Sequence, residues 1–126
     1  MGQVVGVIGA GQLARMMLPP AIELDIDLRV FAASRGESAD RAVTEVGDMH
    51  VLEEVLAFAR GVDVVTFDHE HVPQDVLRGL VDAGVAVHPG PDALAVAQDK
   101  IVMRTRLTEL GVPVPDWVTA YIIWFI

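Results

Sequence analysis

The feature that most constrains the fold is a short apolar run that stops at a glycine-rich turn and leads into a helical pattern. Residues 4–8 read VVGVI and are followed by GAGQLA at 9–14. An apolar run without polar alternation is typical of a strand buried on both faces, as in parallel sheets. Residues 12–24 then have apolar positions at near-helical spacing. Pro19 and Pro20 inside that stretch predict a kink or a restart of the helix.

The rest of the chain continues the alternation of strands and helices. The polar residues 34–48 are expected to form a loop, and Asp92 is expected to cap a short Ala-rich helix. Such an alternation predicts an α/β fold, a Rossmann-like open, mostly parallel sheet with helices on both faces. Further strands are expected at 28–33, 62–67 and 85–87, and further helices at 51–59, from Pro73 to residue 81, and at 101–110.

Composition excludes several classes of protein. A chain of 126 residues with 52% hydrophobic residues suits one folded domain rather than a disordered chain. The 9 Lys and Arg against 18 Asp and Glu give 9 − 18 = −9, which argues against nucleic acid as a partner. There is no cysteine, no signal-like N-terminus and no apolar run long enough for a membrane helix. We therefore expect a cytoplasmic domain without a membrane partner.

The turn at Gly9 and Gly11 has the form G-x-G-x-x-A between a strand and a helix. Glycines let a ligand approach the backbone, and a helix N-terminus favours a phosphate. An NAD site would need an acid at the end of the second strand, where this chain has Ala33 instead. Ser34 and Arg35 suit the 2′-phosphate of NADP, so an NADP-binding oxidoreductase domain stays an alternative.

A second candidate segment, Asp68-His69-Glu70-His71, follows the third predicted strand. In extended chain, residues two apart face the same way, so Asp68 and Glu70 form one pair and the two histidines the other. The carboxylates can accept hydrogen bonds from hydroxyl or amino groups of a ligand. Two histidines do not by themselves make a metal site, so none is predicted. No catalytic triad or phosphate-transfer lysine loop is present, and no catalytic residue is assigned.

Two segments near the C-terminus have ordinary explanations on spacing alone. Asp99 is a good N-cap for the last helix, and Lys100 is then a solvated side chain. Residues 121–126, YIIWFI, form an atypical apolar tail. We interpret it as a cut or altered chain end that needs a packing partner. A docking peptide, and with it a non-catalytic interaction domain, is the alternative.

Four motifs in order give a resemblance to a known family. Residues 9–16, GAGQLARM, resemble the opening G-x-G-Q-L-[GA]-R-M of 5-(carboxyamino)imidazole ribonucleotide synthase, and residues 64–72, VVTFDHEHV, resemble its T-[FY]-E-x-E-[HN]-V segment in an actinobacterial form. Residues 89–94 with 97–100 resemble P-x-P-x-x-L…Q-D-[RK], and residues 111–115, GVPVP, resemble the turn that follows. The resemblance covers residues 4 to about 119 and only the N-terminal part of the much longer family chains.

The resemblance implies an ATP-grasp ligase that carboxylates aminoimidazole ribonucleotide with bicarbonate in purine biosynthesis, using ATP and Mg²⁺. It implies a pre-ATP-grasp substrate-binding domain at 1–97 and the truncated start of the ATP-grasp region at 98–120, in a fragment that is inactive alone. A homodimer is also implied. Asp68 stands where the family motif has Glu, and the site residues implied are Gly9, Gly11, Gln12, Leu13, Asp68 and Glu70 for the ribonucleotide and Lys100 for ATP.

Overall fold

The computed structural model describes residues 2–120, in which four strands form one parallel sheet. The strand order is β3-β2-β1-β4. The chain therefore moves outward from β1 and then crosses back to place β4 on the other side of β1, which makes the gap between β1 and β4 the switch point of the sheet. The strands are β1 (Val4–Ile8), β2 (Asp27–Ala32), β3 (Val43–Val46) and β4 (Val64–Phe67).

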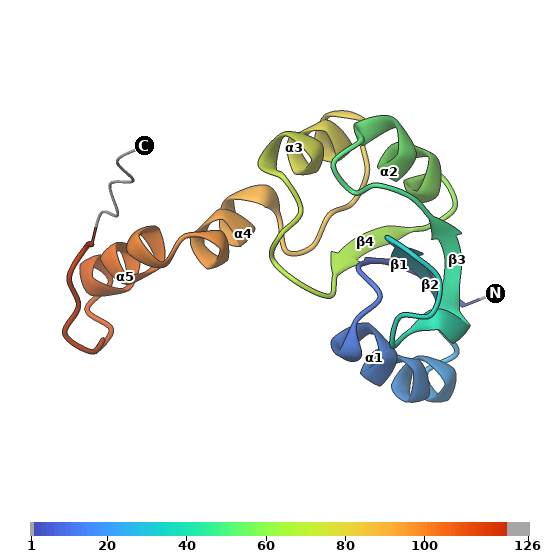
Figure 1. The fold of residues 1–126 in the computed structure, drawn as a ribbon, viewed down its shortest axis with the longest axis horizontal. Coiled ribbons are helices and arrows are strands. Elements are labelled where there is room, and N and C mark those ends of the chain that lie inside the picture. Colours follow the sequence, from blue (N-terminus) through green and yellow to red (C-terminus); the bar gives the residue numbers. More distant parts are fainter. Residues whose placement is uncertain (1, 121–126) are drawn as a thin grey trace, which may run out of the picture.

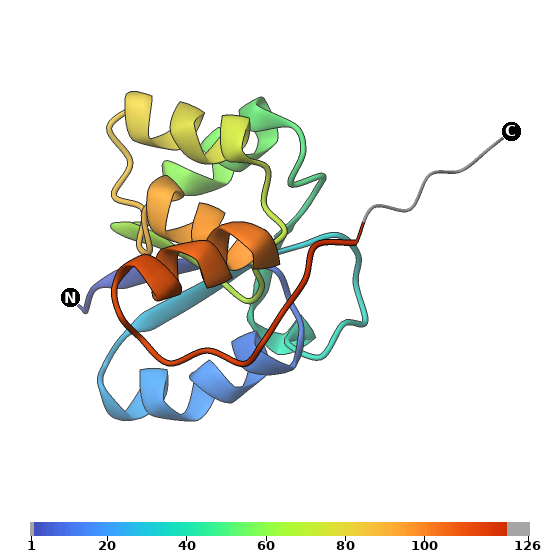
Figure 2. The same cartoon turned by 90° about the vertical axis from the view of Figure 1, so that its left-hand side faces the viewer.

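Helices cover both faces of this sheet, as the sequence predicts (Figure 1). Helix α1 (Gln12–Glu23) lies on one face, near the short 3-10 helix η1 (Asp40–Ala42). Helices α2 (Leu52–Ala59) and α3 (Gln74–Asp82) lie on the other face and contact each other. Figure 2, turned by 90°, shows the same three layers with the sheet in the middle.

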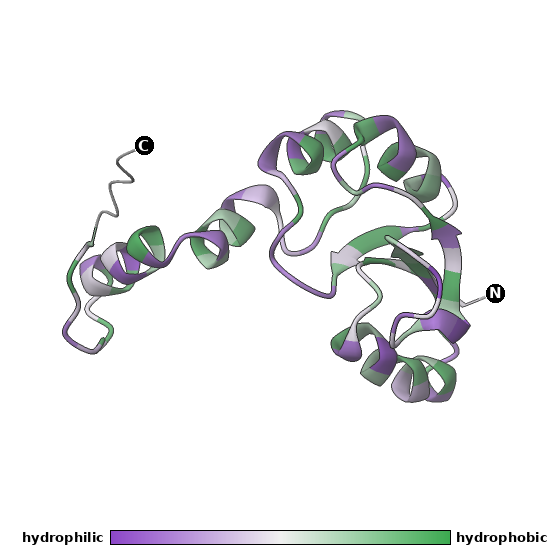
Figure 3. Ribbon diagram, viewed as in Figure 1, coloured by the Kyte–Doolittle hydropathy of each residue, from purple (hydrophilic) through white to green (hydrophobic). Residues whose placement is uncertain are grey.

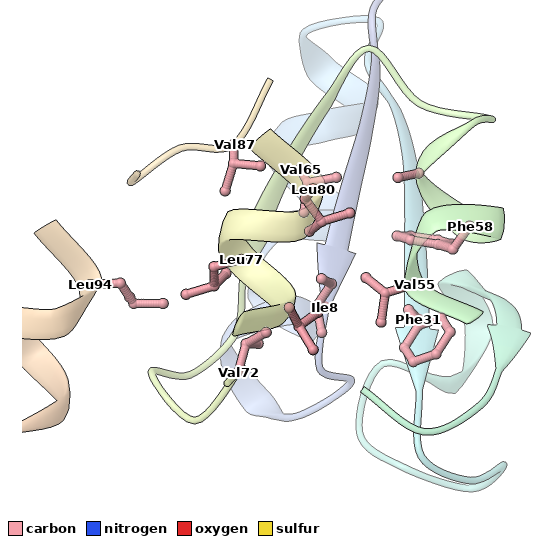
Figure 4. Packing of buried hydrophobic residues seen from close by; sticks show 12 residues of the cluster. Ile8, Phe31, Val55, Phe58, Val65, Val72, Leu77, Leu80, Val87 and Leu94 are labelled. Carbon is pink, nitrogen blue, oxygen red and sulfur yellow. The ribbon is translucent and has the colours of Figure 1, made fainter. Parts of the chain in front are cut away.

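Two apolar cores flank the sheet because neighbouring strand residues point to opposite faces. Val7 and Val30 are fully buried in the core on the α1 side. Ile8 and Phe31 belong to the larger core under α2 and α3 (Figure 4). The ring centroids of Phe31 and Phe58 lie 5.5 Å apart in this core. The VVGVI run is thus buried on both faces at its C-terminal end, which leads directly into the glycine turn.

Two parts of the sheet differ from the sequence prediction. Residues 34–48 are not only a loop, because they contain η1 and the edge strand β3, whose Val43 pairs with Val30. β3 is short and partly exposed, so it lacks the apolar run that marks a buried strand. The predicted strand at 85–87 is reduced to an isolated parallel bridge between Val65 and Val87.

Helix α1 continues through Pro19 and Pro20 as one helix, so of the two predicted outcomes, a kink or a restart, the restart does not occur. Each proline removes one N–H donor and leaves the carbonyl four residues earlier without its helical partner. Those carbonyls belong to Arg15 and Met16, which are both exposed. Water can therefore take the place of the missing donors, which explains why the two prolines are tolerated inside the helix.

Helices α4 (Pro91–Gln98) and α5 (Lys100–Glu109) lead away from the sheet (Figure 1). α4 begins after Gly90 with Pro91 in its first turn, so Asp92 lies in that turn and is not the N-cap. Asp99 does cap α5, because its carboxylate accepts from the amides of Ile101 and Val102. No residue of α5 is buried, although the helix contains hydrophobic residues (green in Figure 3), of which Ile101 and Val102 are exposed. The apolar tail at 121–126 lies outside the described residues.

Candidate functional site

The glycine turn and the acidic strand end meet at the switch point of the sheet. β1 and β4 are paired neighbours, and the Asp68 amide donates to the carbonyl of Ile8 at 3.0 Å. The segment 68–71 therefore begins beside the turn at 9–11. The carboxyl ends of parallel strands at a switch point are where ligands bind in open α/β sheets. The two candidate segments of the sequence analysis thus lie side by side.

Asp68 caps the N-terminus of α1 with both carboxylate oxygens. Oδ2 accepts from the Gly11 amide at 2.6 Å, and Oδ1 accepts from the Ala14 amide at 2.7 Å. A negative charge at this helix end also interacts favourably with the helix dipole. The protein's own carboxylate thus occupies the position that the sequence analysis gave to a ligand phosphate. Asp68 has a structural partner in the chain itself.

The two glycines of the turn allow this close approach. Gly9 has φ +101°, and a Cβ there would lie 2.9 Å from Cβ of Asp68 and 3.0 Å from the His69 ring. A Cβ at Gly11 would meet the Asp68 carboxylate. These positions need glycine for contacts within the chain, whether or not a ligand approaches them.

Glu70 lies at the end of the same segment and is only half-buried. Its backbone carbonyl accepts from Nε2 of Gln98 at 2.8 Å, which fixes the turn that carries the side chain. A hydrogen bond from its own backbone and the charges of His71 and Lys100 lower the pKa of the Glu70 carboxyl. Glu70 is therefore ionised at neutral pH and available as an acceptor beside a cation.

Gln12 and Leu13 form the first exposed turn of α1, where the Leu13 side chain is 57% exposed. Lys100, the first residue of α5, is exposed as well. The fold thus connects Gly9, Gly11 and Asp68 by direct contacts, and it brings Lys100 near enough to influence Glu70. Gln12 and Leu13 stand next to this group in the chain, without a side-chain hydrogen bond to it among residues 2–120.

A cavity of about 330 Å³ lies beside this group, over the carboxyl ends of β1, β2 and β3. Of the predicted site residues, only Gly9 lines it. Sequence reasoning missed the cavity because its outer wall follows β3, a strand without the apolar run that marks a buried strand. The signal available in the sequence was the pair Asp48 and His50 directly after Gly47. The lining residues are Ile8, Gly9, Phe31, Ala33, Glu37, Gly47, Asp48, Met49, His50 and His69.

The arrangement after β2 does not favour the NADP alternative. Arg35 donates from Nη1 to the carbonyl of Val43 at 3.1 Å and lies 3.8 Å from Asp40. The Ser34 amide donates to Oε1 of Glu37 at 3.0 Å. Arg35, the cation that would bind a 2′-phosphate, thus contacts groups of the protein instead. The Glu37 carboxylate beside Ser34 would repel a phosphate.

Two further findings concern the described part of the chain. Within residues 2–120, no cluster of three or more His, Asp or Glu side chains is arranged to hold a metal ion. No helix found there is both long and apolar enough to cross a bilayer.

Comparisons with known proteins decide the family. Residues 1–98 match the model of the ribonucleotide synthetase preATP-grasp domain. The chain belongs to this family. It is 52% identical over 114 residues to the N5-carboxyaminoimidazole ribonucleotide synthase of Corynebacterium ammoniagenes, covering 89% of this chain and 28% of that protein. The enzyme of the same name from Mycobacterium leprae is 47% identical over 113 residues, with 88% and 26% covered.

Solved structures show the same preATP-grasp fold. The synthetase from Thermotoga maritima superposes with a TM-score of 0.79 at 32% identity, covering 90% of this chain and 32% of that chain. The enzyme from Aspergillus clavatus in complex with ADP and aminoimidazole ribonucleotide superposes with a TM-score of 0.78 at 29% identity, with 91% and 31% covered. The chain thus spans less than a third of the length of these relatives.

Proposed function

We propose that this chain is the N-terminal ribonucleotide-binding part of an ATP-dependent ligase that carboxylates aminoimidazole ribonucleotide. The observation that carries the proposal is the family match over residues 1–98, together with a polar segment at the switch point of the sheet. The synthases that share this domain are named for the carboxyamino product. The proposal includes a cytoplasmic location and a homodimer.

Glu70 is the best-placed substrate contact in the described residues. Its ionised carboxylate can accept hydrogen bonds from ribose hydroxyls or from the amine of the ribonucleotide. Gln12 and Leu13 form an exposed turn, and the absence of side chains at Gly9 and Gly11 leaves the backbone beside it accessible. Because the amides of Gly11 and Ala14 already donate to Asp68, the ribonucleotide phosphate is placed away from these two amides. Asp68 then holds the glycine turn and the start of α1 in place and does not contact the phosphate.

The carboxylation needs ATP, Mg²⁺ and bicarbonate. When bound, ATP would supply the phosphoryl group that activates bicarbonate and would leave as ADP; the ribonucleotide amine would then take the carboxyl group, lose a proton and release phosphate. From this chain, Lys100 fits one such contact, because it is an exposed cation at the start of α5 near Glu70. A single lysine does not form a nucleotide site, and the other ATP contacts would come from the rest of the ATP-grasp region. Residues 98–120 are proposed as the beginning of that region.

A chimeric enzyme tests the activity. Residues 1–120 of this chain would be joined to the C-terminal remainder of the Corynebacterium ammoniagenes synthase. We expect ATP hydrolysis that depends on both aminoimidazole ribonucleotide and bicarbonate. A soluble, folded chimera that hydrolyses no ATP with either compound would refute the proposal.

Calorimetry with the chimera tests the role of Glu70. Glu70→Gln keeps the size of the side chain and removes its charge, so we expect about ten-fold weaker ribonucleotide binding with little change in stability. Glu23→Gln, at the far end of α1, is the matched control and should bind like the parent. Equal affinity of the Glu70→Gln protein and the parent would remove Glu70 from the site.

A further inference from the structure

We propose that the cavity over the ends of β1, β2 and β3 is a second binding site, which takes a nucleoside without phosphate. Its volume of about 330 Å³ lies at the lower end of the range for small-molecule sites. Its floor contains Ile8 and Phe31, which belong to the buried core. Its rim carries two carboxylates and two imidazoles. An apolar floor with a few polar groups is the usual composition of a ligand site.

The two carboxylates are held by the chain and still have a free acceptor. Glu37 accepts the Ser34 amide on Oε1 at 3.0 Å. Asp48 accepts on Oδ1 from the His50 amide at 2.9 Å and pairs there with the His50 ring at 2.7 Å. The second oxygen of each carboxylate has no hydrogen bond from residues 2–120. These two free oxygens can accept hydrogen bonds from the hydroxyls of a ribose.

The walls do not suit a phosphate. No Lys or Arg is among the lining residues, and Arg35 is directed to the Val43 carbonyl and Asp40 instead. Of the amides at the start of α1, those of Gly11 and Ala14 already donate to the Asp68 carboxylate. A phosphate in this cavity would be repelled by the carboxylates of Glu37 and Asp48, with no cation among the lining residues to offset the repulsion.

The remaining surface suits a flat base. The His69 ring packs against the backbone of Gly9, and His50 and Met49 line the same cavity. Aromatic and thioether groups make favourable contacts with a flat heteroaromatic ring. A flat ring can pack on the apolar floor, and a free ribose diol can donate hydrogen bonds to the carboxylates of the rim. The ligand class that has both parts is a nucleoside.

The inference stands apart from the ribonucleotide site. Gln12, Leu13, Glu70 and Lys100 do not line the cavity, and only Gly9 is shared with the proposed substrate contacts. Binding here can therefore fail or succeed independently of the ligase activity.

The experiment titrates adenosine into the ¹⁵N-labelled 126-residue chain and follows the amide signals by NMR. We expect saturable shifts at Gly9, Gly47 and His50, with about ten-fold weaker binding of 2′,3′-dideoxyadenosine, which lacks both hydroxyls. Absence of saturable shifts, shifts centred on Gln12 and Glu70, or equal affinity for the dideoxy compound would each overturn the proposal.

Variants separate binding from folding. Glu37→Gln should weaken adenosine binding about ten-fold, and Ala33→Trp, which fills an exposed position at the cavity wall, should abolish it. Glu23→Gln removes a carboxylate that does not line the cavity and should leave binding unchanged. The amide spectra of the free variants show whether each is folded. Full affinity in folded Ala33→Trp would place the adenosine elsewhere and contradict the inference.

Discussion

At the scale of single residues, the switch point is organised by one carboxylate and two glycines. Asp68 binds the amides of Gly11 and Ala14, and the absence of side chains at Gly9 and Gly11 makes room for it. The sequence identified these residues as a site because glycine turns and strand-end acids recur in ligand sites. It could not show that the acid caps the helix, because this depends on the rotamer and the exact spacing of two chain segments that are distant in sequence.

Asp68→Ala should lower the free energy of unfolding by about 1–2 kcal/mol, since it removes a cap from α1. Urea unfolding followed by circular dichroism measures the change. Asp116→Ala is the matched control, because Asp116 is exposed and lies outside any helix or strand. A loss equal to that of the control would mean that the cap contributes nothing to stability.

Gly9→Ala and Gly84→Ala form a matched pair. Both glycines have positive φ, +101° and +82°. A Cβ at Gly84 meets nothing within 4 Å, whereas one at Gly9 would collide with Asp68 and His69. Gly84→Ala should cost about 1 kcal/mol from the backbone conformation alone, and Gly9→Ala about 1–3 kcal/mol more from overpacking. Equal urea midpoints for the two variants would argue against the close contact at the turn.

At the scale of elements, the structure follows the sequence where apolar runs are buried and departs from it at edges. β1 and β2 were predictable because their C-terminal residues lie between two layers of helix. β3 was missed because an edge strand needs apolar residues on fewer positions. The cavity after β3 was missed with it. The junction of α4 and α5 was read as a simple cap, although Gln98 has a wider set of contacts.

Gln98 ties the turn at Glu70 to the end of α4. Its Nε2 donates to the carbonyls of Glu70 at 2.8 Å and Val72 at 2.7 Å, and its Oε1 accepts from Gln74 at 2.9 Å. Gln98→Ala leaves these groups unpaired and should reduce stability by about 2 kcal/mol. Gln3→Ala, an exposed glutamine, is the control in the same urea experiment.

The Gln98→Ala protein should also show a higher pKa at Glu70. The carboxyl pKa is lowered by the backbone hydrogen bond of its own turn and by the charges of His71 and Lys100. Releasing the turn from α4 loosens this arrangement, so the pKa should move upward toward the ordinary value. Carbon-detected NMR titration of the Glu70 carboxyl measures it. An unchanged titration in a destabilised protein would limit Gln98 to a packing role.

At the scale of the whole molecule, the sheet with α1, α2 and α3 forms one body, α4 joins it through the buried Leu94, and α5 leads away from it (Figure 1). Both apolar cores are built from residues up to Leu94. α5 makes its main contacts with α4 and leaves apolar side chains such as Ile101 and Leu110 exposed. The match to the preATP-grasp family likewise covers residues 1–98. The residues that build the two cores and the residues that match the family model thus belong to the same part of the chain.

A chain of residues 1–99 should therefore fold as stably as the chain of 126 residues. It keeps both cores and the Gln98 contacts, and none of the described residues that it loses, 100–120, is buried. We expect the same urea midpoint and a single cooperative transition, because stability follows buried apolar area. Truncation at residue 89, which removes Leu94 from the core, is the destabilised control. A lower midpoint or a lost transition for residues 1–99 would show that α5 supports the fold through contacts beyond α4, and would move the domain boundary past Gln98.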